Sequence, residues 1–200
     1  LDCDIVEWRI DFFEKVEKPE IVAELSHKLK AALNKPLLIT FRTHQEGGVL
    51  PLSDEKYFEL YQTVIAEGKA DLLDLELFMP EAPIAQTIEA AQQKGIKVVM
   101  CNHDFDKTPA KEEIITRLRA MQEKGADICK IAVMPQSSAD VLTLLDATRE
   151  MYETYADRPL ITMSMGALGM VSRVSGQVFG SAATFGSAGI ASAPGQVPVN

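Results

Sequence analysis

The sequence predicts an α/β protein made of repeated strand–helix units, and among such folds we favour a (β/α)8 TIM barrel. Short apolar runs alternate with amphipathic stretches along all 200 residues, which is typical of a parallel sheet covered by helices. No linker, low-complexity segment or charge run interrupts this alternation. An open nucleotide-binding sheet is disfavoured because no GxGxxG motif follows the first run and no GxxxxGK[ST] motif occurs.

Seven runs have the composition of strands. They are residues 5–10, 36–42, 72–78, 96–103, 128–134, 159–165 and, with a weaker pattern, 182–187. A complete barrel has eight strands in about 250 residues, and this chain starts almost directly in its first run. We therefore expect residues 1–200 to form a single (β/α) barrel domain that is incomplete, missing the first strand and the last helix.

The stretches between the runs repeat apolar residues at helical spacing. The clearest stripes lie at residues 21–29, 57–65 and 114–121. Gly68, Gly95 and Gly125 stand a few residues before a strand, where a glycine is expected to end a helix. Thr108 and Pro109 predict an N-cap followed by proline at the first helical position.

Composition excludes several kinds of partner. The 29 acidic residues outnumber the 20 Lys and Arg, for a net charge of −9, whereas nucleic acids and anionic membranes require a basic surface. No apolar run approaches the ~20 residues of a membrane span. Cys3, Cys101 and Cys129 show no CxxC spacing, so neither a disulfide framework nor a zinc knuckle is indicated. We expect a protein of the reducing cytoplasm.

Ionisable residues interrupt runs that should be apolar if both faces of the sheet are buried. In chain order these residues are Glu7 and Arg9, Arg42, Asp74 and Glu76, His103, and Lys130. Residues two apart share one face of a strand, and most of these lie toward the carboxyl ends. In a barrel those ends converge on the active-site mouth.

Lys130 is the most informative of these residues, because it stands within the apolar run 128–133. A charge in such a place must be paired or lost. If burial makes the amine neutral, it becomes a nucleophile toward carbonyl carbon. The alternative is a structural ion pair with Asp74 or Glu76, and the residue types leave both interpretations open.

The other polar residues also have two interpretations each. His103 could be a proton-transfer group or a histidine of the barrel rim. Together with Glu46, Asp74 and Glu76 it could in principle hold a divalent ion, although the three histidines lack metal-ligand spacing. Rim salt bridges would account for Arg42 and Arg173, and an ordinary loop for residues 192–196.

Taken in order, the motifs resemble the type I 3-dehydroquinate dehydratase family over the whole chain. They are Glu-Trp-Arg-Ile-Asp (7–11), Phe-Arg-Thr-x-x-Glu-Gly-Gly (41–48), Cys-Asn-His-Asp-Phe (101–105), Lys-Ile-Ala-Val-Met-Pro (130–135), Ser-Met-Gly (164–166) with Ser172-Arg173 downstream, Phe-Gly-Ser-Ala-Ala-Thr-Phe-Gly (179–186) and Ser-Ala-Pro-Gly-Gln (192–196). The resemblance implies a lyase of the shikimate pathway of aromatic amino-acid biosynthesis. Such an enzyme dehydrates 3-dehydroquinate to 3-dehydroshikimate by syn elimination through a lysine Schiff base, without metal or organic cofactor. Family members are typically homodimers.

The resemblance also implies roles for individual residues. Lys130 matches the Schiff-base lysine, His103 the proton shuttle and Glu46 the carboxylate that orients the histidine. Arg173 resembles the arginine that binds the substrate carboxylate. The remaining expected substrate-binding residues are Glu7, Arg9, Arg42, Ser192 and Gln196.

Two other functions compete with this one. A class I Schiff-base aldolase also uses a strand lysine, but one acting on sugar phosphates would need a phosphate cradle in its late loops. Arg173 and the Gln196 loop suit a carboxylate better. A barrel that binds a polyhydroxy acid without turning it over is the second alternative, if the missing ends disable the site.

Overall fold

The computed structural model describes residues 2–199 and divides into two compact units. The N-terminal unit comprises residues 3–99, and the C-terminal unit comprises residues 100–199 together with Asp2. Strand β4 (Lys97–Asp104) contributes residues to both units. None of the described helices is both long and apolar enough to span a membrane.

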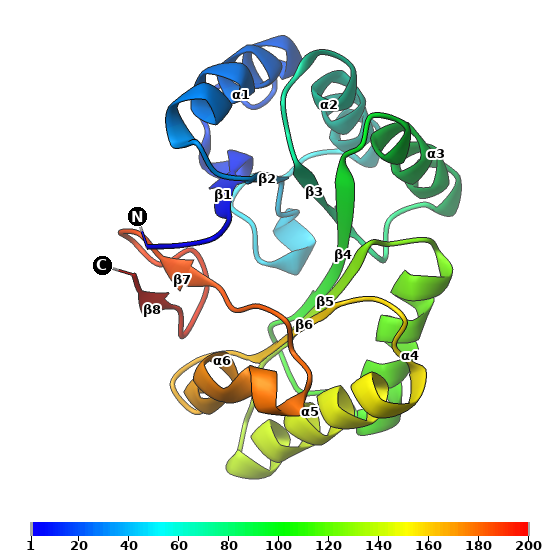
Figure 1. Ribbon diagram of the computed structural model, residues 1–200, viewed down its shortest axis with the longest axis vertical. Helices are drawn as coiled ribbons and strands as arrows, with labels where there is room; N and C mark the ends of the chain where they lie inside the picture. The colour runs from blue at the N-terminus through cyan, green and yellow to red at the C-terminus, as the bar shows by residue number, and fades with distance from the viewer. Residues whose placement is uncertain (1, 200) are drawn as a thin grey trace. The chain divides into compact units, whose positions relative to one another are not determined.

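The N-terminal unit contains three strand–helix repeats (Figure 1). Its elements are β1 (Val6–Arg9), a 3₁₀ turn (Ile10–Phe12), α1 (Pro19–Leu33), β2 (Leu37–Thr40), a second 3₁₀ turn (His44–Glu46), α2 (Asp54–Glu67), β3 (Leu72–Glu76) and α3 (Glu81–Gln93). Strand β1 pairs in parallel with β2, and β2 pairs in parallel with β3. The predicted βα repeat is confirmed here.

Local chemistry sets the ends of these helices. Pro19 opens α1, where its missing N–H is not needed, and Asn34 ends it in the left-handed conformation with φ 49°. The Ser53 hydroxyl caps α2 by accepting the N–H of Lys56 at 3.3 Å. The predicted apolar stripe of α2 is buried, including Tyr57 and Tyr61. All residues of β2 and β3 are buried as well, as expected for parallel strands.

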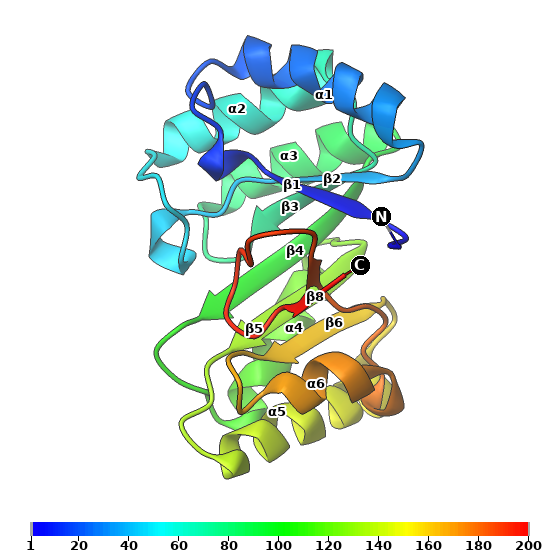
Figure 2. The same ribbon diagram turned by 90° about the vertical axis from the view of Figure 1, so that its left-hand side faces the viewer.

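The C-terminal unit continues the repeat. Its elements are α4 (Lys111–Glu123), β5 (Ile128–Val133), α5 (Ser138–Glu150) with a π-helical end (Met151–Tyr155), β6 (Leu160–Ser164), α6 (Met170–Ser175) with a 3₁₀ end (Gly176–Phe179), β7 (Gly186–Ser187) and β8 (Val197–Pro198). Strands β5 and β6 are parallel, with Lys130 opposite Ile161. Helices α5 and α6 both pack on β6 (Figure 2). Strands β7 and β8 form a separate parallel pair.

One expectation about helix ends is corrected, the start of α4, whereas Gly68 ends α2 as expected. Helix α4 begins at Lys111 rather than at Pro109, because the Thr108 hydroxyl donates to the carbonyl of Met134 at 2.9 Å and so does not cap the helix. Gly95 and Gly125 follow their helices with φ of 73° and 93°, as predicted. Gly68 ends α2 without a left-handed φ. It is required for space instead, since a Cβ there would lie 2.7 Å from the Val64 carbonyl oxygen.

Candidate active site

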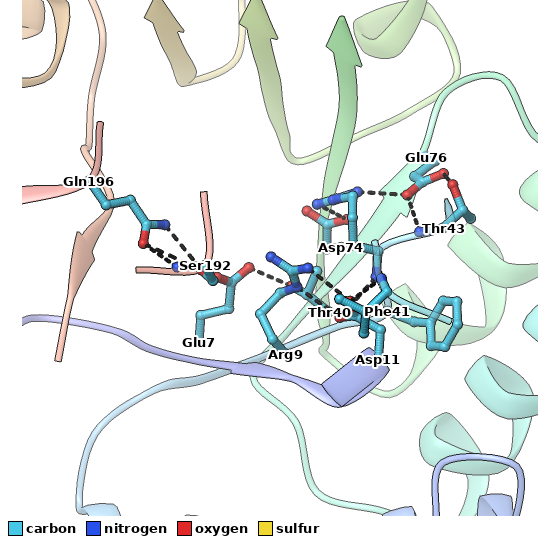
Figure 3. A network of polar contacts seen from close by, with 12 residues as sticks. Glu7, Arg9, Asp11, Thr40, Phe41, Thr43, Asp74, Glu76, Ser192 and Gln196 are labelled. Carbon is cyan, nitrogen blue, oxygen red and sulfur yellow. Dashed lines mark hydrogen bonds and ion pairs between the residues drawn. The ribbon is translucent and has the colours of Figure 1, made fainter. Parts of the chain in front are cut away.

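The carboxyl ends of the N-terminal strands carry a buried ion network (Figure 3). Arg42, two residues after β2, extends one guanidinium nitrogen to Asp74 at 2.9 Å and another to Glu76 at 2.8 Å. Asp74 and Glu76 are alternate residues of β3 and therefore share a face. All three side chains are buried. Two fixed carboxylates thus set the position of this guanidinium.

Glu76 also fixes the turn that carries Glu46. It accepts the N–H of Thr43 at 2.9 Å and the Thr43 hydroxyl at 2.6 Å. The Thr43 carbonyl in turn accepts the N–H groups of Glu46 and Gly48 at 3.1 and 2.8 Å. Gly47 has a φ of 91°, and a Cβ on Gly48 would lie 1.9 Å from the carbonyl oxygen of Arg42. The two glycines therefore allow a tight turn with a buried Glu46.

Two tyrosine hydroxyls of α2 form hydrogen bonds with the backbone near the carboxyl ends of β2 and β3. The Tyr61 hydroxyl donates to the carbonyl of Asp74 and accepts the N–H of Phe41 at 3.0 Å. The Tyr57 hydroxyl accepts the N–H of Glu76 at 3.2 Å. Burial, together with the nearby Asp74 carboxylate, raises the pKa of Tyr61 well above its usual value. The Tyr61 phenol therefore stays protonated and remains a donor.

Glu7 and Arg9 are alternate residues of β1 and share one face of the strand, as predicted from their spacing. Glu7 accepts the hydroxyl of Thr40 at 2.8 Å. Arg9 donates two hydrogen bonds to Asp11, both of 2.8 Å, and its guanidinium carbon lies 5.1 Å from the Phe12 ring centroid. The N-terminal unit thus contains four of the predicted site residues, namely Glu7, Arg9, Arg42 and Glu46.

Lys130 lies within β5 with only 3% of its surface exposed. Its ammonium nitrogen is 4.7 Å from the centroid of the Phe185 ring. Because Lys130 stands opposite Ile161 in the parallel pair, both point to the same face of the sheet. An apolar cluster occupies that face, formed by Ala132, Ile161, Met163 and Met165, with Phe185 packed against it. Lys130 therefore shares its face of the sheet with apolar side chains.

His103 lies near the end of β4 and is partly exposed. Its ring stacks on Phe105, with centroids 6.4 Å apart and an interplanar angle of 21°. This contact restricts the plane of the imidazole. His103 and Lys130 belong to the same unit.

Arg173 differs from Arg9 and Arg42, the other predicted site arginines, in its hydrogen-bond partners. It is buried, and one of its terminal nitrogens donates to the carbonyl of Pro194 at 2.8 Å, while the other lies 3.6 Å from the sulfur of Met163. The Nε atom has no hydrogen-bond partner, and no carboxylate pairs with Arg173 in the described part of the C-terminal unit. Burial lowers the pKa of this guanidinium below its usual value. The arrangement leaves a desolvated cation ready for an anionic ligand.

Ser192 and Gln196 lie in the loop that reaches Arg173. The Gln196 amide oxygen accepts the N–H of Ser192 at 2.9 Å, and its nitrogen donates to the Ser192 hydroxyl at 3.2 Å (Figure 3). The Pro194 carbonyl accepts the N–H of Gly166, just beyond β6, at 3.2 Å. The loop is thus fastened to the end of β6, and its Pro194 carbonyl contacts Arg173.

Sequence reasoning gave no role to several residues that shape these two regions. They are Asp11, Thr43, Met163, Phe185 and Pro194. All but Met163 lie inside the quoted motifs, and an acid two positions after Arg9 and an aromatic residue in the 179–186 segment were available signals. The carbonyl of Pro194 has no signal in a sequence, because every residue carries one.

The chain matches the family model "Type I 3-dehydroquinase" over residues 1–200. It is 58% identical over 200 residues to the 3-dehydroquinate dehydratase of Enterococcus faecalis, a match that covers all of this chain and 79% of that protein. The enzyme of Bacillus subtilis is 53% identical over 201 residues, with the same coverage.

Solved structures agree with these matches. The E. faecalis 3-dehydroquinate dehydratase superposes with a TM-score of 0.93 at 57% identity, covering 94% of this chain and 79% of that one. The Geobacillus kaustophilus enzyme gives 0.94 at 40% identity, covering 98% and 77%. These likenesses confirm the predicted α/β barrel class. The charged residues at the strand ends and the buried strand lysine are consistent with this family match. The chain belongs to the type I 3-dehydroquinase family of hydro-lyases.

Proposed function

We propose that this chain dehydrates 3-dehydroquinate to 3-dehydroshikimate through an imine formed on Lys130, without a metal or organic cofactor. The dehydration is the activity for which its relatives are named. The observation that carries the imine is a lysine buried within a strand and facing an apolar cluster. A relative from Clostridium difficile has been solved with covalently modified comenic acid, which supports covalent chemistry in this family.

The surroundings of Lys130 suit both halves of imine formation. The reaction uses the neutral amine of Lys130, whose lone pair attacks the carbon of the substrate ketone. The carbonyl oxygen then leaves as water, and an iminium remains. The Phe185 ring beside Nζ stabilises this new cation through its π face. The iminium accepts the electron pair that is released when the neighbouring carbon loses a proton.

His103 is proposed to move that proton. A base with a pKa near neutrality can deprotonate carbon beside an iminium, and the resulting imidazolium can return the proton to the departing hydroxyl. Stacking on Phe105 supports a fixed ring plane. Glu46 is proposed to orient the imidazole and to stabilise its charged form. Its tight, hydrogen-bonded turn supports this role.

Arg173 is proposed to hold the substrate carboxylate. A planar guanidinium binds a carboxylate through two parallel hydrogen bonds. The buried Nε without a partner supports this assignment. The substrate hydroxyls would be bound by the remaining expected residues, which are Glu7, Arg9, Arg42, Ser192 and Gln196.

Borohydride trapping tests the imine. We expect the chain, incubated with 3-dehydroquinate and sodium borohydride, to gain the mass of the reduced adduct on the peptide that contains Lys130. Lys130→Ala should gain none, and the wild-type turnover should persist in EDTA. A folded wild-type chain that dehydrates the substrate yet never traps would contradict the imine. Trapping without formation of the conjugated enone product would favour a binding-only barrel.

We further propose that the chain works in the cytoplasm as a homodimer. The family resemblance supports the dimer. Cys101 and Cys129, which are buried inside strands as small apolar side chains, support a reducing compartment. Light scattering at micromolar concentration tests the dimer, and a mass equal to one chain would contradict it.

A further inference from the structure

Asp11 is the last residue of the Glu-Trp-Arg-Ile-Asp motif. It is buried, with 3% of its surface exposed, and it accepts four hydrogen bonds. Two come from the Arg9 guanidinium at 2.8 Å each. The other two, from the N–H groups of Arg42 and Val49, are longer at 3.4 Å each. Each carboxylate oxygen therefore receives one guanidinium bond and one backbone bond.

These donors come from three different segments. Arg9 ends β1, Arg42 follows β2, and Val49 follows the turn that carries Glu46. Figure 3 shows Asp11 beside Arg9 at the end of the strands. A bidentate contact fixes the plane of a guanidinium as well as its position. A single carboxylate thus orients one arginine and also contacts the end of the Glu46 turn.

The opposite end of that turn is held by a second carboxylate. Glu76 accepts both the N–H and the hydroxyl of Thr43. The turn from Thr43 to Val49 therefore lies between two buried acids, each of which also binds an arginine. Loss of either acid would release one end of the turn, and loss of Asp11 would also free the Arg9 guanidinium, whereas Arg42 would keep Asp74 if Glu76 were lost.

We propose that Asp11 is a positioning residue that couples the orientation of Arg9 to the placement of the Glu46 turn. The inference rests on the proposed function, in which Arg9 binds substrate and Glu46 orients the proton-transfer histidine. Asp11 itself acts through its neighbours. Its removal should therefore change both substrate affinity and the pH dependence of turnover.

Asp11→Asn is the direct test. The amide keeps the size of the side chain but removes the charge and one of the two acceptors of the Arg9 fork. We expect KM for 3-dehydroquinate to rise about 10- to 100-fold, because a charge-assisted hydrogen bond is lost. We also expect the acidic limb of the kcat pH profile to move, because the Glu46 turn is no longer closed at Val49.

A double-variant cycle separates positioning from a general loss of structure. In an Arg9→Ala background, Asp11→Asn should add little further to KM, because its effect on affinity is transmitted through Arg9. Full additivity would overturn the coupling. If Asp11→Asn does not fold, Asp11→Glu gives the same test, since it keeps the charge but moves both oxygens by one methylene.

Asp71 offers a matched control in the same unit. Its carboxylate also accepts a lysine ammonium, from Lys30 at 2.7 Å, and a strand N–H, from Leu37 at 2.8 Å. It lies at the opposite, amino-terminal end of the strands. Asp71→Asn should lower the melting temperature while leaving KM and the pH profile unchanged.

Trapping distinguishes the inference from the function on which it rests. At saturating 3-dehydroquinate, borohydride should still label Lys130 in Asp11→Asn. A variant that traps and also keeps the wild-type KM and pH profile would overturn the role of Asp11 alone. A wild-type chain that never traps would overturn the proposed imine instead.

Discussion

Two buried arginines, one in each unit, are built in opposite ways. Arg42 places its guanidinium between the carboxylates of Asp74 and Glu76, at 2.9 and 2.8 Å. Arg173 is equally buried, but its guanidinium contacts a backbone carbonyl and a thioether sulfur. The chain supplies the counter-charge for the first arginine, whereas the described C-terminal unit supplies none for the second. The fold therefore fixes the position of Arg42 before any substrate contact, whereas Arg173 is equipped as a receptor for an anion.

The two arrangements have different energetic consequences. A buried charge without a partner is costly, and a protein retains one where function requires it. A paired buried charge need add little net stability, but removing one partner is severe because the other charge stays buried. The comparison therefore separates a substitution that should harm activity with little loss of stability from one that should lower stability as well.

Arg173→Met should have the largest effect on activity and little adverse effect on stability. Loss of two charge-assisted hydrogen bonds to the substrate carboxylate should lower kcat/KM about 10³-fold. The thioether fills similar space without a charge to desolvate, and the Pro194 carbonyl keeps the N–H of Gly166. Steady-state kinetics and urea unfolding measure the two effects.

Arg173→Lys is the control for the same site. It keeps the positive charge but loses the planar fork, so we expect intermediate activity. A large loss of stability in Arg173→Met, with kcat/KM near wild type, would reverse the comparison and make Arg173 a structural residue.

Arg42→Met should lower the free energy of unfolding by about 3–5 kcal/mol, because it strands two buried carboxylates. Adding Glu76→Gln to this variant should recover part of the loss, since one of the stranded charges is removed. Urea unfolding at pH 7 gives both values. An Arg42→Met chain as stable as wild type would show that Asp74 and Glu76 do not depend on this arginine.

Much of this arrangement could be read from the sequence. The alternating runs predicted the parallel strands, and the charges within those runs marked the residues at the strand ends. Lys130 stood out because a charge among Ile128, Cys129 and Ile131 breaks an otherwise apolar strand. Such charges are easy to recognise in a sequence because a strand buried on both faces is otherwise almost entirely apolar.

Contacts between distant segments could not be predicted in the same way. The four bonds of Asp11 come from residues 9, 42 and 49, and a sequence does not show which segments will meet. Thr108 is a similar case on a smaller scale. Its hydroxyl can cap a helix or donate to a carbonyl. It donates to the carbonyl of Met134, which the fold brings within hydrogen-bond distance.

The difference between the units also predicts that the interior of the C-terminal unit destabilises a buried anion. Cys129 lies beside Lys130 in β5 and is fully buried. Burial, aided by the charge of Asp157, raises the pKa of its thiol from 9.0 to about 12. An unfolded chain releases this proton near pH 9, whereas the folded chain keeps it until about pH 12. Stability from this group is therefore complete below pH 9 and declines as the pH rises above it.

The slope of that decline is the smallest effect predicted. Each pH unit above 9 should cost about 1.4 kcal/mol of unfolding free energy through this thiol. Cys129→Ala should lower stability at every pH by leaving a small cavity, but its alkaline slope should be shallower than that of wild type by this amount. Equal slopes for wild type and Cys129→Ala between pH 9 and 10.5 would mean that this interior accepts a thiolate. The C-terminal unit would then tolerate a buried charge of either sign without a counter-ion. The lack of a carboxylate partner for Arg173 would in that case no longer indicate an anion-binding site.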